Sequence, residues 1–140
     1  MTKFRGAQPT KSAFSAKEKA LPKLVSENDQ KPLFSFEHMP NGSGFSISCA
    51  GPDDRSQLAS KLYQLSQMTW MQINQAPRHG SGSEIIARAA IKAKVPPAVT
   101  DDTNMLAFRY SGKRPMVGYR DGRTFHVLWL DWNFTLYDHG

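Results

Sequence analysis

The stretch MLAFRYSGKRPMVGYRDGRTFHVLWLDWNFTLYDH, residues 105–139, decides the fold. It is rich in aromatic and β-branched residues, which favour strands, and turn-forming pairs interrupt it at Ser111-Gly112, Asp121-Gly122 and Trp132-Asn133. Asp-Gly is a strong signal for a hairpin turn. We therefore expect a C-terminal four-stranded antiparallel meander, with strands at Met105–Tyr110, Arg114–Arg120, Thr124–Asp131 and Phe134–His139.

The residues before this stretch predict two helices and a further hairpin. Apolar residues recur at spacings of three and four behind Pro52-Asp53-Asp54, which is typical of an amphipathic helix over about residues 53–75. Ser81-Gly82-Ser83-Glu84 has the spacing of a capping box and predicts a second, shorter helix that ends before Pro96. Farther upstream, residues 33–39 and 45–50 flank a glycine-containing loop and predict an N-terminal hairpin. The expected fold class is α+β, an antiparallel sheet with both helices packed on one face.

Length and composition limit the classes of protein that are compatible with the chain. Its 140 residues, 39% of them hydrophobic, suit one folded domain. Cys49 is the single cysteine, so an internal disulfide and a cysteine-based zinc site are excluded. The first residues lack the apolar run of a secretory signal, and no stretch is long and apolar enough to cross a bilayer. We expect a cytoplasmic protein that has no membrane partner and no cofactor.

Positive charge is concentrated in two parts of the chain, whose formal net charge is +6. Residues 1–31 contain seven Lys or Arg residues against three acids and few large apolar residues. We expect them to form a basic flexible tail before a single domain over residues 32–140. The tail either contacts phosphates or is a solubilising leader. A second surplus lies between residues 104 and 123, and it indicates either a nucleic-acid surface or a solvated face.

The expected strand register decides which side chains share a face of the sheet. A turn at Asp121-Gly122 places Arg120 opposite Arg123 and Val117 opposite His126. Alternation along the strands then puts Tyr119, His126, Tyr137 and His139 on one face. Arg114, Arg120 and Arg123 point towards the other face, beneath the helices. They reach the histidines only from strand ends, across an edge or through a bulge.

These residue types fit the chemistry of a metal-independent ribonuclease. Imidazole exchanges a proton near neutral pH, a phenol positions the substrate, and guanidinium groups hold a phosphate while the ribose 2′-hydroxyl attacks it. The candidate catalytic residues are His126, Arg120, Tyr137 and Arg114, with His139 as the alternative to His126 for proton transfer. The candidate nucleic-acid-binding residues are Arg109, Lys113, Arg123, Tyr119 and His139. For each of them the alternative is a structural histidine, a core aromatic or a solvated cation. No acid or cysteine clearly completes a metal site with the two histidines, so none is expected.

Several motifs of the C-terminal portion resemble the RelE/ParE toxin superfamily. They are Lys113-Arg114 at the start of a strand, Val117-Gly118-Tyr119-Arg120, the apolar strand Phe125 to Leu130, and Leu136-Tyr137. The resemblance implies a small bacterial toxin, often an mRNA interferase that acts in the ribosomal decoding centre and is neutralised by an antitoxin protein. It also implies that Arg114, Arg120 and Tyr137 contribute to cleavage. The chain departs from the superfamily at Asp131-Trp132, where a His-Arg pair is usual. Residues 136–140 also resemble the ends of small uncharacterised bacterial proteins associated with mobile elements.

Two hypotheses follow from the sequence. The leading hypothesis is a toxin-like RNA-binding protein whose catalytic form is a metal-independent, ribosome-associated endoribonuclease. Its partners are then RNA or the ribosome, together with an antitoxin-like protein. The alternative is a noncatalytic interaction module, in which the helices and aromatic surface bind a protein while the basic tail contacts nucleic acid.

Overall fold

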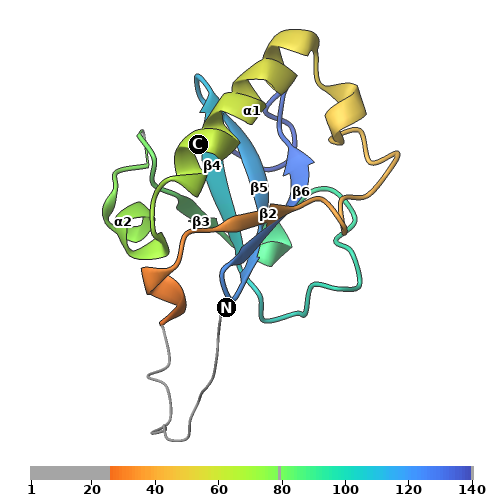
Figure 1. The fold of residues 1–140 in the computed structure, drawn as a ribbon. Helices are drawn as coiled ribbons and strands as arrows, with labels where there is room; N and C mark the ends of the chain where they lie inside the picture. Colours follow the sequence, from red (N-terminus) through yellow and green to blue (C-terminus); the bar gives the residue numbers. More distant parts are fainter. Residues whose placement is uncertain (1–25, 79, 140) are drawn as a thin grey trace, which may run out of the picture.

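A five-stranded mixed sheet forms the centre of the computed structural model, which describes residues 26–78 and 80–139 (Figure 1). Its three long strands are β4 (Met105–Ser111), β5 (Arg114–Asp121) and β6 (Thr124–Leu130), which pair antiparallel in sequence order. Two short strands form the edges: β2 (Leu33–Ser35) is parallel to β6, and β3 (Glu84–Ile86) is antiparallel to β4. The strand order is therefore β2-β6-β5-β4-β3. The predicted α+β class and three strands of the predicted meander are confirmed.

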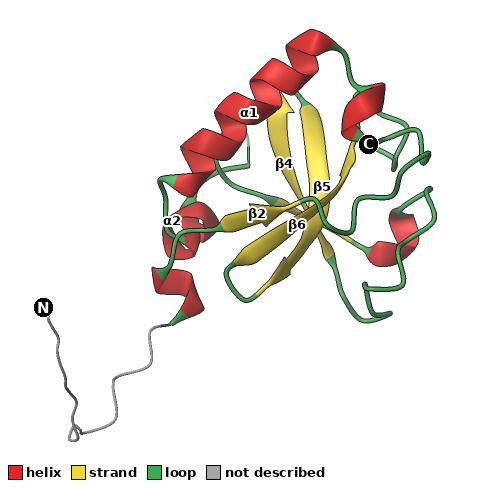
Figure 2. Ribbon diagram, turned by 45° about the vertical axis from the view of Figure 1, so that its right-hand side comes forward, coloured by secondary structure: helices red, strands yellow, loops and turns green. Residues whose placement is uncertain are grey.

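Two helices cover one face of this sheet (Figure 2). They are α1 (Pro52–Ser66) and α2 (Trp70–Gln75), and three short 3-10 helices lie at Glu27–Asp29, Ile47–Cys49 and Arg88–Ala90. The predicted single helix over residues 53–75 is interrupted because Thr69 starts a new helix. Thr69 Oγ1 accepts from Gln72 N at 3.2 Å, and Thr69 N donates to Gln72 Oε1 at 2.9 Å, which is a capping box. No helix in the described ranges is long and apolar enough to cross a membrane.

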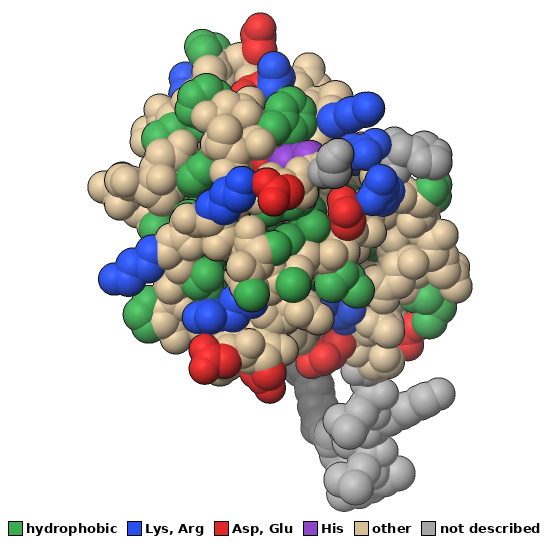
Figure 3. All heavy atoms as spheres, turned by 180° about the vertical axis from the view of Figure 1, so that it is seen from behind, with side chains coloured by type: hydrophobic (Ala, Val, Ile, Leu, Met, Phe, Trp, Pro, Cys, Tyr) green, Lys and Arg blue, Asp and Glu red, His purple; other side chains and the backbone are tan. Residues whose placement is uncertain are grey.

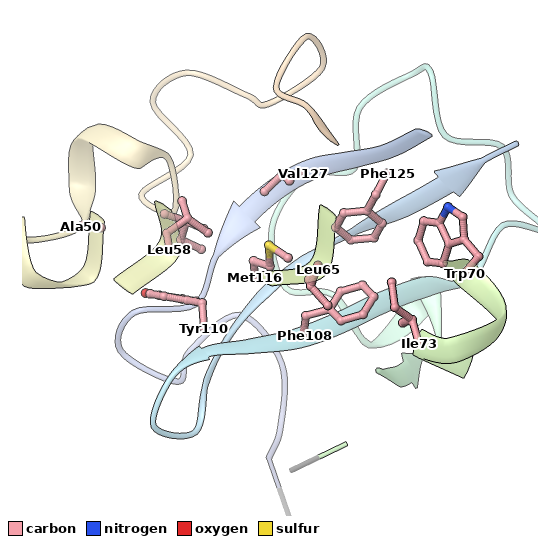
Figure 4. Packing of buried hydrophobic residues seen from close by; sticks show 11 residues of the cluster. Ala50, Leu58, Leu65, Trp70, Ile73, Phe108, Tyr110, Met116, Phe125 and Val127 are labelled. Carbon is pink, nitrogen blue, oxygen red and sulfur yellow. The ribbon is translucent and has the colours of Figure 1, made fainter. Parts of the chain in front are cut away.

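The helices bury a hydrophobic core against the sheet (Figure 4). Leu65 of α1 and Trp70 of α2 are fully or almost fully buried against Phe108 of β4 and Phe125 of β6. The rings of Phe108 and Phe125 meet edge to face, with centroids 5.2 Å apart. Trp70 also donates a hydrogen bond from Nε1 to the carbonyl oxygen of Arg123 at 2.9 Å, so the indole nitrogen is satisfied. This core fixes both helices on one side of the strands.

The opposite face of the sheet is covered by irregular segments instead of helices. Ile91 and Val99, between β3 and β4, and Leu136, after β6, pack with Trp129 in a second core. Lys92 N donates to the carbonyl oxygen of Leu136 at 2.8 Å and joins the two segments. The strands are buried on both faces, which explains why their sequences are almost continuously apolar. The segment after β6 is thereby held across the sheet.

The predicted N-terminal hairpin is wrong. Leu33–Ser35 pairs with residues 124–126 of β6, and the carbonyl oxygen of Phe45 accepts from Leu130 N at 2.7 Å farther along the same strand. The first segment therefore forms a strand that pairs with β6, while the second forms no strand, contains the 3-10 helix Ile47–Cys49 and bonds to β6 through Phe45. The reason is that β6 is otherwise a free edge, whose unpaired backbone groups are available to both segments.

The predicted second helix and the predicted fourth strand of the meander are also wrong. Glu84–Ile86 forms β3, because the β-branched Ile85 and Ile86 add to the edge of β4, and a single 3-10 turn follows. Residues 134–139 form no strand. Asp131 Oδ1 accepts from the backbone nitrogens of Thr135 at 2.9 Å and Leu136 at 3.1 Å, so these amides are used locally and the chain turns.

The β5–β6 turn is shifted by one residue from the prediction. Asp121 pairs with Thr124, so the turn residues are Gly122, at φ 63°, and Arg123. Tyr119 consequently lies opposite His126. Moving the turn by one residue displaces the pairing of β5 with β6 by two residues. Because two is an even number, Tyr119 and His126 still share a face, as expected.

A β-bulge between Val117 and Gly118 changes which face Trp129 occupies. Val117 pairs with Trp129, while Gly118 pairs with Val127, which leaves one residue of β6 without a partner. Trp129 therefore packs in the loop-covered core and not beneath the helices as predicted. Gly118 permits the bulge, because a Cβ atom there would lie only 1.8 Å from the carbonyl oxygen of His126.

The folded part of the chain begins before the predicted domain boundary. Ser26 caps the 3-10 helix Glu27–Asp29, and the carbonyl oxygen of Gln30 accepts from Trp70 N at 3.0 Å. Residues 26–31 thus pack with the domain, although we expected them in the tail. Residues 1–25 of the predicted tail lie outside the described residues.

Candidate active site

A pocket of about 550 Å³ opens on the loop-covered face of the sheet. Its volume is in the range typical of small-ligand sites, about 300–1,000 Å³. Four residues that the sequence singled out line it together: Arg109, Lys113, Tyr137 and His139. The remaining lining residues are Arg78, Glu84, Ala107, Pro115, Phe134 and Asp138. The strands β3 and β4, the start of β5 and the segment after β6 therefore meet at one site.

A buried carboxylate holds the histidine of this pocket. Asp131 is fully buried, and its Oδ2 lies 2.6 Å from His139 Nε2, while its Oδ1 accepts the two backbone hydrogen bonds described above. An ionised carboxylate can only accept, so His139 donates through Nε2. Nδ1 of His139 is then the nitrogen with a free lone pair. In this arrangement the acid fixes the tautomer and orientation of the imidazole.

Two aromatic side chains flank His139. The Tyr137 ring stacks on the imidazole, with centroids 4.1 Å apart and an interplanar angle of 25°. Burial raises the pKa of Tyr137 to about 12, and the nearby carboxylates of Glu84 and Asp131 act in the same direction. The Tyr137 hydroxyl therefore stays protonated at neutral pH. Phe134 meets His139 edge to face, with centroids 5.1 Å apart.

The acidic side chains of the pocket are paired with cations. Arg78 NH1 lies 3.1 Å from Glu84 Oε2, and Lys92 Nζ lies 2.7 Å from Asp138 Oδ1. Both pairs are largely exposed, so they contribute little to stability. Their effect on the pocket is that two of its negative charges are offset.

Two further cations line the pocket. Arg109 lies on β4, and Lys113 lies in the turn between β4 and β5. Among residues 26–78 and 80–139, neither side chain forms an ion pair. On the face turned away from α1, Figure 3 shows a histidine with several Lys and Arg side chains and also acidic side chains around it. The arrangement therefore suits an anion, which a guanidinium and an ammonium can bind beside an imidazole and a phenol.

The turn after Asp131 brings the aromatic residues over the sheet. Phe134, in this turn, has φ 61° and is the one non-glycine residue at positive φ in the described part of the chain. A left-handed conformation costs an L-residue about 1–2 kcal/mol. The hydrogen bonds to Asp131 Oδ1 hold the turn, so Tyr137 and His139 return to the pocket instead of continuing outward as a strand.

The predicted catalytic residue His126 lies outside this pocket. It stacks on Tyr119, with centroids 4.7 Å apart and an interplanar angle of 15°, and the ring of His38 lies 5.1 Å away on centroids. His126 and Tyr119 are each about 9% exposed. Burial raises the pKa of Tyr119. The structure therefore places these two predicted residues in an aromatic stack without Arg109, Lys113 or the other pocket cations.

Arg120, also predicted to be catalytic, lies on the helix-covered face. Its NH2 group donates to Asn28 Oδ1 at 2.8 Å, and its Nε donates to the carbonyl oxygen of Gly122 at 2.6 Å. Its guanidinium lies over the Trp70 ring, 4.2 Å from the centroid. These contacts attach the N-terminal segment and α2 to the sheet, which is a structural role.

The other two predicted arginines also have structural partners on that side. Arg114 NH1 lies 3.0 Å from Asp54 Oδ1 of α1, and Arg123 Nε donates to the carbonyl oxygen of Lys31 at 3.0 Å. The predicted orientation of the three arginines away from His139 is consistent with these partners. Of the four predicted catalytic residues, the structure places Tyr137 alone in the pocket, and His139 is the histidine it brings there.

Among the residues of the site that the sequence does not single out, Asp131, Phe134 and Arg78 matter most for its geometry. The sequence predicts Asp131 at the end of one strand and Phe134 at the start of the next, positions that by themselves indicate no side-chain role. A signal was present, because an Asp that ends an apolar strand before Trp-Asn is suited to an Asx-type turn that binds backbone amides. Arg78 lies in a loop, and nothing in its surroundings indicated the pocket.

No protein-family model matches the chain, and no curated protein or solved structure is significantly similar to it. Among the described residues, no three His, Cys, Asp or Glu side chains gather as metal ligands. Fold and site together define the class: an α+β protein with a basic pocket that contains an Asp-His pair and a tyrosine.

Proposed function

We propose that the chain is an RNA-binding protein that cleaves RNA at the Asp131–His139 pocket without a metal ion. One observation carries the proposal. The carboxylate-held imidazole, the protonated phenol of Tyr137 and two cations that form no ion pair within the described residues line a single pocket. These are the groups that phosphodiester cleavage by a neighbouring hydroxyl requires.

The proposed reaction assigns one task to each group. Arg109 and Lys113 bind the phosphate and stabilise the charge that develops on it. His139 Nδ1 accepts the proton of the ribose 2′-hydroxyl, whose oxygen forms a bond to phosphorus. The bond from phosphorus to the 5′-oxygen breaks, and the Tyr137 hydroxyl donates a proton to this leaving oxygen. The products are a 2′,3′-cyclic phosphate and a 5′-hydroxyl, and exchange with water restores both side chains.

The test is cleavage of labelled RNA by the full-length protein in the presence of EDTA. It should be run with and without ribosomes, because the resemblance to RelE/ParE toxins implies a ribosome-bound substrate. We expect products that carry a 2′,3′-cyclic phosphate, and no cleavage of DNA of the same sequence, since DNA has no 2′-hydroxyl.

Three variants make this test specific. His139→Gln retains an N–H donor for Asp131 but has no base, so cleavage should fall at least about 100-fold while RNA binding changes little. Arg109→Ala should lower both cleavage and RNA binding, because it removes a phosphate contact. Lys31→Ala removes an exposed cation outside the pocket and is the matched control, for which we expect wild-type cleavage.

The outcomes separate the proposal from its alternative. RNA binding without any turnover, with or without ribosomes, would favour the noncatalytic interaction module. Cleavage that persists in His139→Gln would show that the activity belongs to another site. If the wild-type protein neither binds nor cleaves RNA, the proposed function is wrong.

A further inference from the structure

Phe134 occupies a backbone position that its residue type disfavours. At φ 61° a Cβ atom is crowded, and Gly or Asn would adopt this conformation more readily. The turn itself depends on the Asp131 carboxylate and on the backbone nitrogens of Thr135 and Leu136, so it does not require an aromatic residue at position 134. The geometry of the turn therefore does not explain why residue 134 is aromatic.

The Phe134 ring lies in a solvent-exposed pocket and not in a hydrophobic core. The residue is 44% exposed and lines the same pocket as Arg109 and Lys113. It belongs to neither hydrophobic core of the described residues. Among these residues His139 is its one aromatic partner, and the two rings meet edge to face. A large apolar ring is thus left partly in water beside the groups that bind the anion.

We propose that Phe134 is a stacking platform for an unpaired nucleobase, so that the substrate of the pocket is single-stranded RNA. This inference rests on the proposed function. The phosphate bound by Arg109 and Lys113 carries a base on the adjoining ribose, and an aromatic ring beside a phosphate site can stack on any base. A base within a duplex has both faces covered by its neighbours and is not available for such stacking.

The substitution Phe134→Asn separates this role from a structural one. Asn removes the ring and tolerates positive φ, so the free energy of unfolding should be unchanged or higher. Affinity for single-stranded RNA should fall by about 5- to 150-fold, which corresponds to the loss of stacking on one base. Phe134→Trp retains a stacking face and should bind within a few-fold of wild type.

An RNA with abasic nucleotides at and beside the cleavage position tests the base itself. Wild type and Phe134→Asn should bind and cleave this RNA equally, because neither protein can gain from stacking there. If Phe134 acted only by holding His139, Phe134→Asn would lower cleavage of the abasic and the intact RNA by the same factor, and the proposal would be overturned. Unchanged binding of intact single-stranded RNA, or equal preference for duplex RNA, would also overturn it.

Failure of this inference can be distinguished from failure of the proposed function. If Arg109→Ala and His139→Gln show their expected defects while Phe134→Asn does not, the cleavage site stands and the stacking platform is wrong. If the wild-type protein does not bind RNA, both are wrong.

Discussion

Asp131 determines both the local turn and the chemistry of the pocket. A buried carboxylate is costly unless its oxygens are satisfied, and here two backbone amides and one imidazole N–H satisfy them. The same three hydrogen bonds that compensate for burial fold residues 131–139 into a turn and hold His139 in one orientation. At the scale of single residues, the carboxylate that holds the turn therefore also holds the histidine that we propose as the base.

Substitution of Asp131 by Asn should uncouple these roles. The Asn oxygen can still accept from the backbone nitrogens of Thr135 and Leu136, but its amide then faces His139 Nε2 with a donor. His139 must shift its proton to Nδ1 and loses its function as a base. We expect cleavage to fall by about 10³-fold or more, with a loss of about 1–3 kcal/mol in stability. Single-turnover cleavage and urea unfolding measure these two quantities, and wild-type cleavage would contradict the assignment.

Tyr137 should make the stability of the protein fall in alkaline solution. The pKa of Tyr137 is raised to about 12 in the folded protein, against about 10 in the unfolded chain. Between these values the unfolded state loses the proton first, so stability is fully present below pH 10 and is lost as pH approaches 12, at up to about 1.4 kcal/mol per pH unit. Tyr137→Phe should reduce this slope in urea unfolding between about pH 9 and pH 11. An unchanged slope would show that the hydroxyl is not buried as described.

At the scale of elements, the bulge in the β5–β6 pairing sets the positions of the end of β6 and of the segment that follows it. Because Leu130 is displaced by one position relative to a regular ladder, the chain leaves the sheet at Asp131 with this side chain inside the protein. In a regular ladder without the bulge, the side chains from this point onward would point to the opposite side of the sheet. The pocket thus depends on a backbone irregularity in the middle of the sheet.

Gly118→Ala should test this dependence. The new Cβ atom would overlap the carbonyl oxygen of His126, a backbone atom that cannot move without breaking the strand pairing. We expect a loss of at least about 3 kcal/mol in the free energy of unfolding, measured with urea. Gly51→Ala is the control, because a Cβ atom there meets nothing within 4 Å and φ is not positive. Equal effects of the two substitutions would contradict the bulge geometry.

At the scale of the whole molecule, the two faces of the sheet differ in how their cations are partnered. The helices and the arginines Arg114 and Arg120 make the structural face, where the cations already have partners. The loop-covered face carries the pocket, where Arg109 and Lys113 have no ion-pair partner among the described residues. The net charge of +6 therefore overstates how many cations are available to a polyanion in the folded part.

Salt dependence of RNA binding should show how many cations take part. Loss of Lys113 should lower the slope of log K against log salt concentration by about 0.7, the value for one phosphate contact on a single strand. Lys31→Ala should leave the slope at the wild-type value. The measurement is a binding titration of single-stranded RNA at several salt concentrations, and equal slopes for both variants would place Lys113 outside the interface.

Local signals were sufficient for the parts of the fold that local interactions specify. The hairpins β4–β5 and β5–β6 and the start of α1 were predicted, because turn residues, β-branched residues and a proline at the helix start act over a few positions. The strand at Leu33–Ser35 was predicted, but its pairing with β6 was not, and β3 was expected to be helical. A segment of three residues carries little periodicity of its own, and its state is decided by a free strand edge that is distant in sequence.

The sequence by itself determined the α+β class, the basic character of the chain, and Tyr137, His139, Arg109 and Lys113 as residues suited to phosphate chemistry. Only the tertiary structure decided that these four residues line one pocket while His126, Arg114 and Arg120 lie elsewhere. The physical reason is that their positions follow from the bulge at Gly118 and from the hydrogen bonds of buried Asp131, and both depend on backbone atoms of neighbouring strands and turns that no residue spacing reveals.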